Sequence, residues 1–138
     1  LFLTGNGGAT STQLNWGTSY LTVNAGNVTL SNYAMFNSGT GTGNYVAPSS
    51  TLTLDNTAVA LNNRLGGRGL WENGNFTIIG NAITPVSETI FGATADFATG
   101  NGTTFGFSTI TLNANNGAAV TAIVNSNNNY VINRSATS

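Results

Sequence analysis

Thr51–Gly80, TLTLDNTAVALNNRLGGRGLWENGNFTIIG, is the stretch of sequence that decides the fold. It begins with the alternating triplet Leu52-Thr53-Leu54 and ends near a second one, Phe76-Thr77-Ile78, which follows at a 24-residue step. One backward step of the same length reaches Val28-Thr29-Leu30. Alternation of apolar residues with Thr is typical of half-buried β-strands. Three such triplets at one spacing indicate a chain that returns to the same place at each step, as stacked repeats do.

The 24-residue step predicts an all-β fold, a right-handed parallel β-helix (β-solenoid) of about five to six coils. A step of this length holds three short strands and three corners. No segment offers an apolar stripe of helical period, because Gly and Asn interrupt each candidate. The chain is expected to form a single module, residues 1–138, which is one segment of a longer array or a filament subunit. The predicted inward positions are Val28, Leu30, Leu52, Leu54, Phe76 and Ile78, with Thr outward between them.

An antiparallel β-sandwich is the main alternative fold, since it also explains the alternation, although it does not explain the 24-residue step. Residues 83–90 contain Pro85 and are expected to form a loop. A second, weaker internal similarity joins Thr51–Arg64 to Thr121–Arg134, with Leu54 aligned to Val124. Its offset is about three steps of the same repeat, so it agrees with the period of the triplets.

The composition excludes several classes of function. Charged residues make up 5% of the chain, against about 25% in ordinary domains. With three Arg, no Lys and a net charge of −1, the chain cannot build the basic stripe that nucleic-acid binding requires. The absence of Cys and His removes disulfides, imidazole bases and the usual zinc ligands. No apolar run approaches the roughly 20 residues of a membrane span, so no membrane insertion is expected.

The residue types that stand in place of charged ones suggest where the protein is located. The Asn-, Thr- and Gly-rich composition without Lys favours an extracellular or cell-surface protein. Because the chain starts at Leu1 rather than Met, we expect a processed form or an excised segment. No cofactor and no metal is expected.

Two parts of the chain contain short sequence motifs that resemble those of a known family. LFLTGNG and LTVNAGNVTLSN, within residues 1–32, resemble the autotransporter-associated β-strand repeat of long secreted bacterial proteins. TLTLDN, NR and GNFTIIG, within residues 51–80, resemble the longer repeats of related giant surface proteins. The resemblance implies a right-handed β-helix and an extracellular stalk, adhesin or fibre, with no catalytic site. The positions that match the family pattern are Leu1, Leu3, Gly5, Asn6, Val23, Gly26 and Leu30.

Few residues carry candidate chemistry. Asp55 and Arg64 flank a short segment and are expected to form a structural ion pair across a corner. Glu72 and Asp96 are separated by the same 24-residue step and could serve as the acid and nucleophile of a glycosidase. Like charges stacked in one column repel each other, so the two carboxylates are more readily placed on different faces.

Surface chemistry is limited to two kinds of candidate. Trp16 and Trp71 could stack on glycans, although packing at a corner is the alternative. Four Asn-X-Ser/Thr sequons are acceptors for N-glycosylation in a suitable secretory context. They place possible glycosylation at Asn27, Asn75, Asn101 and Asn133.

The leading functional prediction is a structural module of an extracellular fibre, stalk or adhesin that performs no catalysis. Leu1-Phe2-Leu3 and Tyr130-Val131-Ile132 place strand patterns near both ends, and no polar cap is evident there. Open strand edges pair with further strands, so we expect end-to-end β-stacking with copies of the chain or with flanking repeats. The alternative is a passenger domain that binds or cleaves polysaccharide, with surface glycans as partners.

Overall fold

The computed structural model describes residues 1–5, 12–14, 21–36, 44–66, 70–72, 74–91 and 109–125. Within these ranges all regular structure is β and no helix occurs, so the predicted all-β class is confirmed. The strands are β1 (Phe2–Gly5), β2 (Thr12–Leu14), β3 (Thr22–Val23), β4 (Asn27–Asn32), β5 (Ala34–Phe36), β6 (Asn44–Val46), β7 (Thr51–Asp55), β8 (Leu70–Glu72), β9 (Asn75–Ile79), β10 (Val86–Phe91), β11 (Thr109–Asn113) and β12 (Val120–Asn125).

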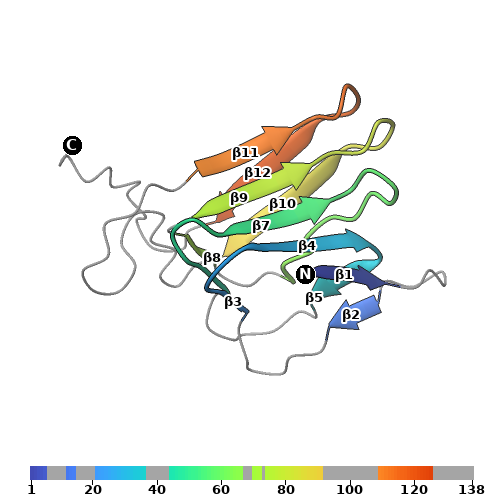
Figure 1. Cartoon of the computed structure of the whole chain (residues 1–138). Coiled ribbons are helices and arrows are strands. Elements are labelled where there is room, and N and C mark those ends of the chain that lie inside the picture. The colour runs from blue at the N-terminus through green and yellow to red at the C-terminus, as the bar shows by residue number, and fades with distance from the viewer. Residues whose placement is uncertain are drawn as a thin grey trace, which may run out of the picture.

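The largest sheet has five strands in the order β1-β4-β7-β9-β11, and they lie one above another in Figure 1. Its register places Thr29 opposite Thr53 and Thr53 opposite Thr77, which confirms the 24-residue step. All strand pairs among the described residues are parallel. This part of the chain therefore lacks the antiparallel pairing that the β-sandwich alternative requires.

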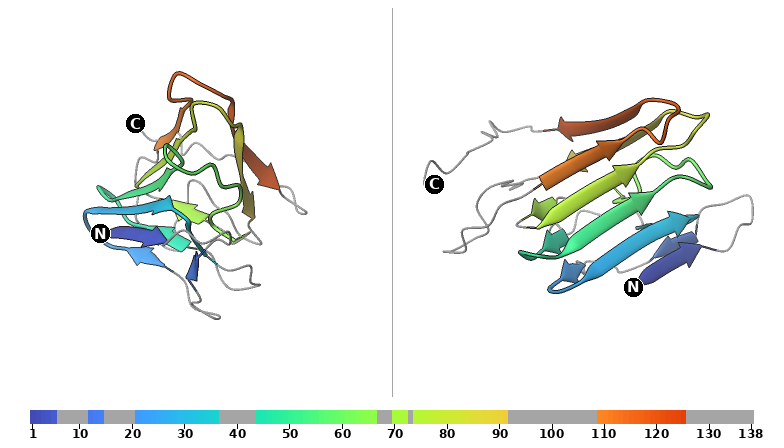
Figure 2. Two further views of the ribbon diagram at one scale, coloured as in Figure 1. Left: turned by 90° about the vertical axis from the view of Figure 1, so that its right-hand side faces the viewer. Right: turned by 45° about the horizontal axis from the view of Figure 1, so that its top comes forward.

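Among the described strands, three smaller sheets accompany the large one, with the pairings β2-β5, β10-β12 and β3-β6-β8. The two views of Figure 2 show the strands of the large sheet stacked in sequence, with β10 and β12 forming a second parallel stack. The repeat lengthens near its end, because the pairing of Ile110 with Phe76 and that of Val120 with Val86 both span more of the chain than the earlier step. The increase is the same in both sheets, which places the additional residues after β10 and before β11.

Each strand of the large sheet, with the residues up to the next such strand, is here called a layer. Layer 1 begins at β1, layer 2 at β4, layer 3 at β7, layer 4 at β9 and layer 5 at β11. The predicted inward side chains of layers 2 to 4 are at most 7% exposed, while Thr29, Thr53 and Thr77 lie half-buried between them. The core is one cluster of apolar residues from β3 to β9: Leu21, Val23, Val28, Leu30, Ala34, Phe36, Val46, Leu52, Leu54, Leu65, Phe76 and Ile78.

Asn and Gly shape the corners between strands. Asn32 has a φ of 51°, a left-handed conformation that Asn tolerates better than most residues. The side chain of Asn56 donates to the carbonyl of Ile79 (3.1 Å), and that of Asn81 donates to the carbonyl of Asn56 (3.0 Å). A Cβ on Gly74 would lie 2.3 Å from the Ala47 carbonyl oxygen, so this corner needs glycine. The side chains of Asn56 and Asn81 therefore join layers 3 and 4 through main-chain oxygens.

One local prediction was wrong. Val86–Phe91 form β10, although residues 83–90 were expected to be a loop. Pro85 precedes the strand instead of lying within it, so it removes no hydrogen bond from the strand. The weak similarity of Thr51–Arg64 to Thr121–Arg134 joins segments of different sheets, because β7 belongs to the large sheet whereas β12 pairs with β10.

Candidate functional site

Residues 62–65 of layer 3 interrupt what would otherwise be a continuous second sheet. They lie between β5 and β10, because Phe36 N donates to the Arg64 carbonyl (2.8 Å) and Asn63 N donates to the Ser87 carbonyl (3.0 Å). Asn63 has a φ of 53°, and a left-handed residue cannot continue an extended strand. The β2-β5 and β10-β12 pairs consequently remain separate sheets.

Two Asn side chains replace main-chain acceptors at this interruption. Asn62 Oδ1 accepts from Ser87 N at 2.8 Å, and Asn63 Oδ1 accepts from Thr89 N at 3.0 Å. Both donors belong to β10, which runs beside the irregular segment and would otherwise lack acceptors there. The amide oxygens therefore satisfy the edge of β10 as a neighbouring strand would.

The carboxylate of Glu88, on β10, in turn accepts hydrogen bonds from main-chain N–H groups of the irregular segment. Its Oε2 accepts from Arg64 N at 2.7 Å and its Oε1 accepts from Leu65 N at 2.9 Å. Glu88 projects from the middle of β10 and is 2% exposed. One buried side chain thus supplies both acceptors that the irregular segment needs, and it connects layer 4 to layer 3.

The guanidinium group of Arg64 is fully buried and binds five oxygen atoms. Two of the acceptors belong to layer 2 and three to layer 3, so the side chain joins adjacent layers at the corner. We call Arg64, Glu88 and these five acceptors the arginine clamp. The bonds run from Nε to Asn56 Oδ1 (2.7 Å), from Nη1 to Ala34 O (2.6 Å), and from Nη2 to Asn32 O (2.8 Å), Val59 O (3.0 Å) and Asp55 O (3.1 Å).

Burial shifts the titration of both charged members of the clamp. It lowers the pKa of Arg64 to about 10, while the negative charges of Glu88 and Asp55 act in the opposite direction. Burial also raises the pKa of Glu88 to about 7, which is reduced from a still higher value by the N–H groups of Leu65 and Arg64 and by the Arg64 charge. Arg64 therefore stays charged at neutral pH, whereas Glu88 titrates close to it.

The clamp joins parts of the chain and presents no reactive group to solvent. Arg64 is held by oxygen atoms and Glu88 by N–H groups, so neither is free to transfer a proton to a substrate. Among the described ranges, no three His, Cys, Asp or Glu residues come together as a metal site. The same ranges contain no helix long and apolar enough to span a membrane.

Asp55 and Arg64 meet, but not through two opposite charges in hydrogen-bond contact. Arg64 contacts the main-chain oxygen of Asp55, and the Asp55 carboxylate accepts from Thr57 N at 2.9 Å. The carboxylate that binds the main chain of Arg64 belongs to Glu88, which sequence reasoning placed in a loop. The missed signal was the repeat itself, since Glu88 follows Arg64 by the same step that separates Thr53 from Thr77.

The other predicted site residues that the structure describes are not members of the arginine clamp. Asn27 and Asn75 are both exposed and both stand opposite Thr51, so these two sequons share one column of the large sheet. Trp71 and Glu72 lie in β8. Trp16, Asp96, Asn101 and Asn133 lie outside the described residues.

Comparison with protein-family models, with curated proteins and with solved structures finds no match to this chain.

Proposed function

We propose that the chain is a right-handed parallel β-helix that serves as a structural module of an extracellular fibre, stalk or adhesin. Its function is cohesion between layers, along the stack and onward to flanking repeats or further copies, and it performs no catalysis. The resemblance of its short motifs to autotransporter-associated repeats agrees with this proposal, as does its low content of charged residues.

The observation that carries the proposal is the in-register column of apolar side chains through successive layers. Leu30 stands opposite Leu54 and Leu54 opposite Ile78, each nearly or fully buried. No single layer could bury these side chains alone, so each layer depends on its neighbours for its core. A molecule built in this way gains stability as layers are added, which suits an extended element that transmits load.

The arginine clamp supports the same function from the corner of the stack. Arg64 binds layers 2 and 3, and Glu88 binds layer 4 to the main chain of Arg64. Pulling these layers apart would expose a buried cation and a buried carboxyl group while breaking the hydrogen bonds of both. The clamp thus opposes separation of three consecutive layers, and this is a mechanical role.

The proposal is tested by replacing the clamp and pulling on the molecule. In Arg64→Met, five oxygen atoms lose their donor, and we expect the free energy of unfolding to fall by about 3–5 kcal/mol. In single-molecule pulling along the stack, the unfolding force should fall with it. Ile83→Met is the control, because Ile83 is 87% exposed and its replacement should change the stability by less than about 0.5 kcal/mol.

A polysaccharide panel completes the test of function. We expect no saturable binding of the chain to soluble or insoluble polysaccharides and no release of reducing sugar. Saturable binding or sugar release that is unaffected by Arg64→Met would replace the structural proposal with the polysaccharide-acting alternative. A low unfolding force that is the same in the parent chain and in Arg64→Met would contradict a load-bearing role.

A further inference from the structure

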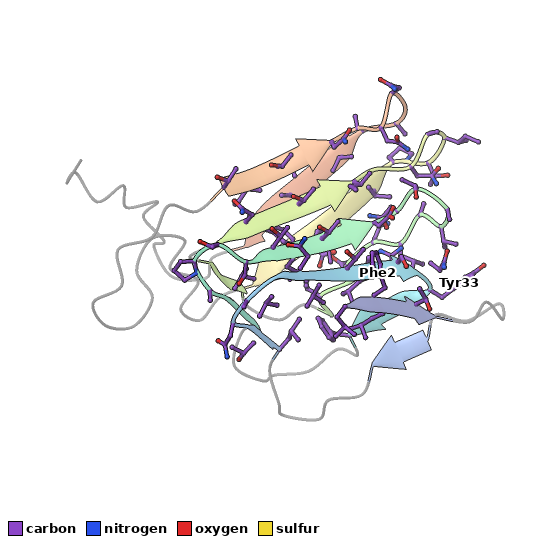
Figure 3. The ribbon with its side chains drawn as sticks, in the orientation of Figure 1. Phe2 and Tyr33 are labelled. Atoms are coloured by element: carbon purple, nitrogen blue, oxygen red, sulfur yellow. The ribbon has the colours of Figure 1, made fainter. Side chains whose placement is uncertain are left out.

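Apolar side chains are exposed at both open edges of the large sheet. On β11, Ile110 is 41% and Leu112 46% exposed, although Phe76 and Ile78, their partners on β9, are buried. On β1, which Figure 3 shows at the opposite edge with Phe2 labelled, Phe2 is 76% exposed. The inward columns of the core therefore continue to β11, and no further layer covers them in the part of the chain that the structure describes.

The main-chain groups at the β11 edge have a defined polarity. Thr109 N donates to Gly74 O (3.1 Å) and Asn113 O accepts from Gly80 N (2.7 Å), so these odd-numbered residues bond to β9. Residues of a parallel strand turn their N–H and C=O groups alternately to one neighbour and to the other. Ile110 and Leu112 therefore direct their main-chain groups to the open edge.

The β1 edge has the complementary polarity. Leu1 O accepts from Thr29 N (2.9 Å), so the odd-numbered residues of β1 bond to β4. By the same alternation, Phe2 and Thr4 direct their main-chain groups to the open edge. A strand of this polarity fits above β11 when Phe2 stands opposite Thr111, because Phe2 N then meets Ile110 O and Leu112 N meets Phe2 O.

The side chains select the same register independently. Leu3 stands opposite Leu30, and the column continues through Leu54 and Ile78 to Leu112. Placing Phe2 over Thr111 puts Leu3 over Leu112 and extends that column by one residue. A shift by one residue would turn Leu3 outward and would also mismatch the hydrogen-bonding groups, so both criteria exclude it.

We propose that β11 of one molecule pairs in parallel with β1 of a second copy of this chain, with Thr111 opposite Phe2 and Leu112 opposite Leu3. The proposal rests on the proposed function, since it names the partner of the open edges. The pairing continues the interface that already joins β9 to β11. It covers the inward side chains of Ile110 and Leu112 with Leu1 and Leu3 of the second copy, while Phe2 and Thr111 meet on the outer face. The contact is head to tail, so it does not close on itself and it produces filaments.

Disulfide cross-linking tests the register, and the absence of Cys from the chain gives a clean background. Phe2→Cys and Thr111→Cys chains are mixed under mild oxidation. We expect a disulfide-linked heterodimer in the mixture at a yield at least tenfold above that of Leu3→Cys mixed with Thr111→Cys, where the two thiols lie on opposite faces. Equal yields, or a higher yield for Phe2→Cys with Thr109→Cys, would overturn the register.

Sedimentation velocity tests the association itself. The parent chain should form concentration-dependent oligomers, and Leu112→Asp should weaken association at least tenfold, since it places a charge at the contact. Ile83→Asp is the matched control, because Ile83 is exposed in the turn between β9 and β10 and belongs to neither edge strand, so its replacement should leave association unchanged. A parent chain that stays monomeric at millimolar concentration overturns the proposal.

The two proposals fail in different ways. A monomeric chain whose unfolding force falls in Arg64→Met would retain the structural function and lose only the self-pairing. A chain that cross-links as expected but binds polysaccharide would retain the self-pairing and lose the purely structural function.

Discussion

At the residue scale, the fold depends on how it treats buried polar atoms. Burying a charge without partners is costly, and Arg64 avoids this cost because oxygen atoms surround its guanidinium group. Among buried side-chain polar atoms of the described residues, only Ser50 Oγ has no hydrogen-bond partner. The clamp is therefore a satisfied polar network, and such networks fix one arrangement of the chain.

The titration of Glu88 predicts a pH dependence of stability. Its pKa is about 7 in the folded chain and 4.5 by default in the unfolded chain, so the folded state binds the proton more tightly. The contribution of Glu88 to the free energy of unfolding is fully present below about pH 4.5 and is lost as the pH rises through about 7. The loss amounts to about 3 kcal/mol. Urea denaturation of the parent chain at pH 4.5, 6 and 8 measures the decrease.

Glu88→Gln is the control for this pH dependence. The amide cannot ionise, and its single oxygen can accept from only one of the two N–H groups of Arg64 and Leu65. We expect a variant that is less stable at low pH but loses the slope between pH 4.5 and 7. If the parent chain grows more stable as the pH rises through this window, the carboxylate form is preferred in the folded state and the assigned pKa shift is wrong.

Residue-level sequence reasoning succeeded for apolar positions and failed for charged ones. The inward side chains were predicted because strict alternation leaves one choice of face. The burial of Arg64 was not predicted, because Arg in a Gly-rich turn is ordinarily exposed. Only the three-dimensional arrangement of five oxygen atoms from two layers makes its burial favourable.

At the element scale, the 24-residue period predicted strands β4, β7 and β9 and their register. It did not predict β10, since Pro85 indicated a loop and only the structure shows that the strand begins after it. The break in the second sheet was also not predicted. It follows from the left-handed Asn63 and from side chains that replace main-chain acceptors, and local propensity contains no signal for such replacements.

The position of a strand in the stack sets the cost of losing its side chains. Leu54 and Leu112 occupy one column, but among the described layers Leu54 is covered on both sides and Leu112 on one side. We expect Leu54→Ala to lower the free energy of unfolding by about 2–5 kcal/mol, and Leu112→Ala by less than about 1 kcal/mol. Chemical denaturation at low protein concentration measures both.

The same pair of variants contains its own control, since the substitution is identical and only the layer differs. A Leu54→Asp chain should not fold, because an unpaired charge would replace a fully buried leucine. Equal losses for Leu54→Ala and Leu112→Ala would show that layer 5 is as well covered as layer 3, which would contradict an open edge at β11.

At the scale of the whole molecule, stability is expected to vary along the stack. The strand pairs of the described residues join neighbouring layers, so cooperativity is transmitted from layer to layer. The buried apolar column and the arginine clamp both lie in layers 2 to 4. Among the described strands, layer 5 has only one neighbour, and its strand β11 is exposed along its whole length.

This difference predicts a gradient of hydrogen exchange along the stack. Amides of β7 and β9 should exchange only through global unfolding, whereas the amides of β11 that bond to β9 should exchange at least tenfold faster through local opening of the last layer. Mass spectrometry of peptides covering each strand measures the gradient. At higher protein concentration, pairing of β11 with β1 of a second copy would slow exchange in these two strands and leave β7 unchanged. Equal protection of β7 and β11 in dilute solution would mean that the last layer is not open, and the driving force for self-pairing would then be absent.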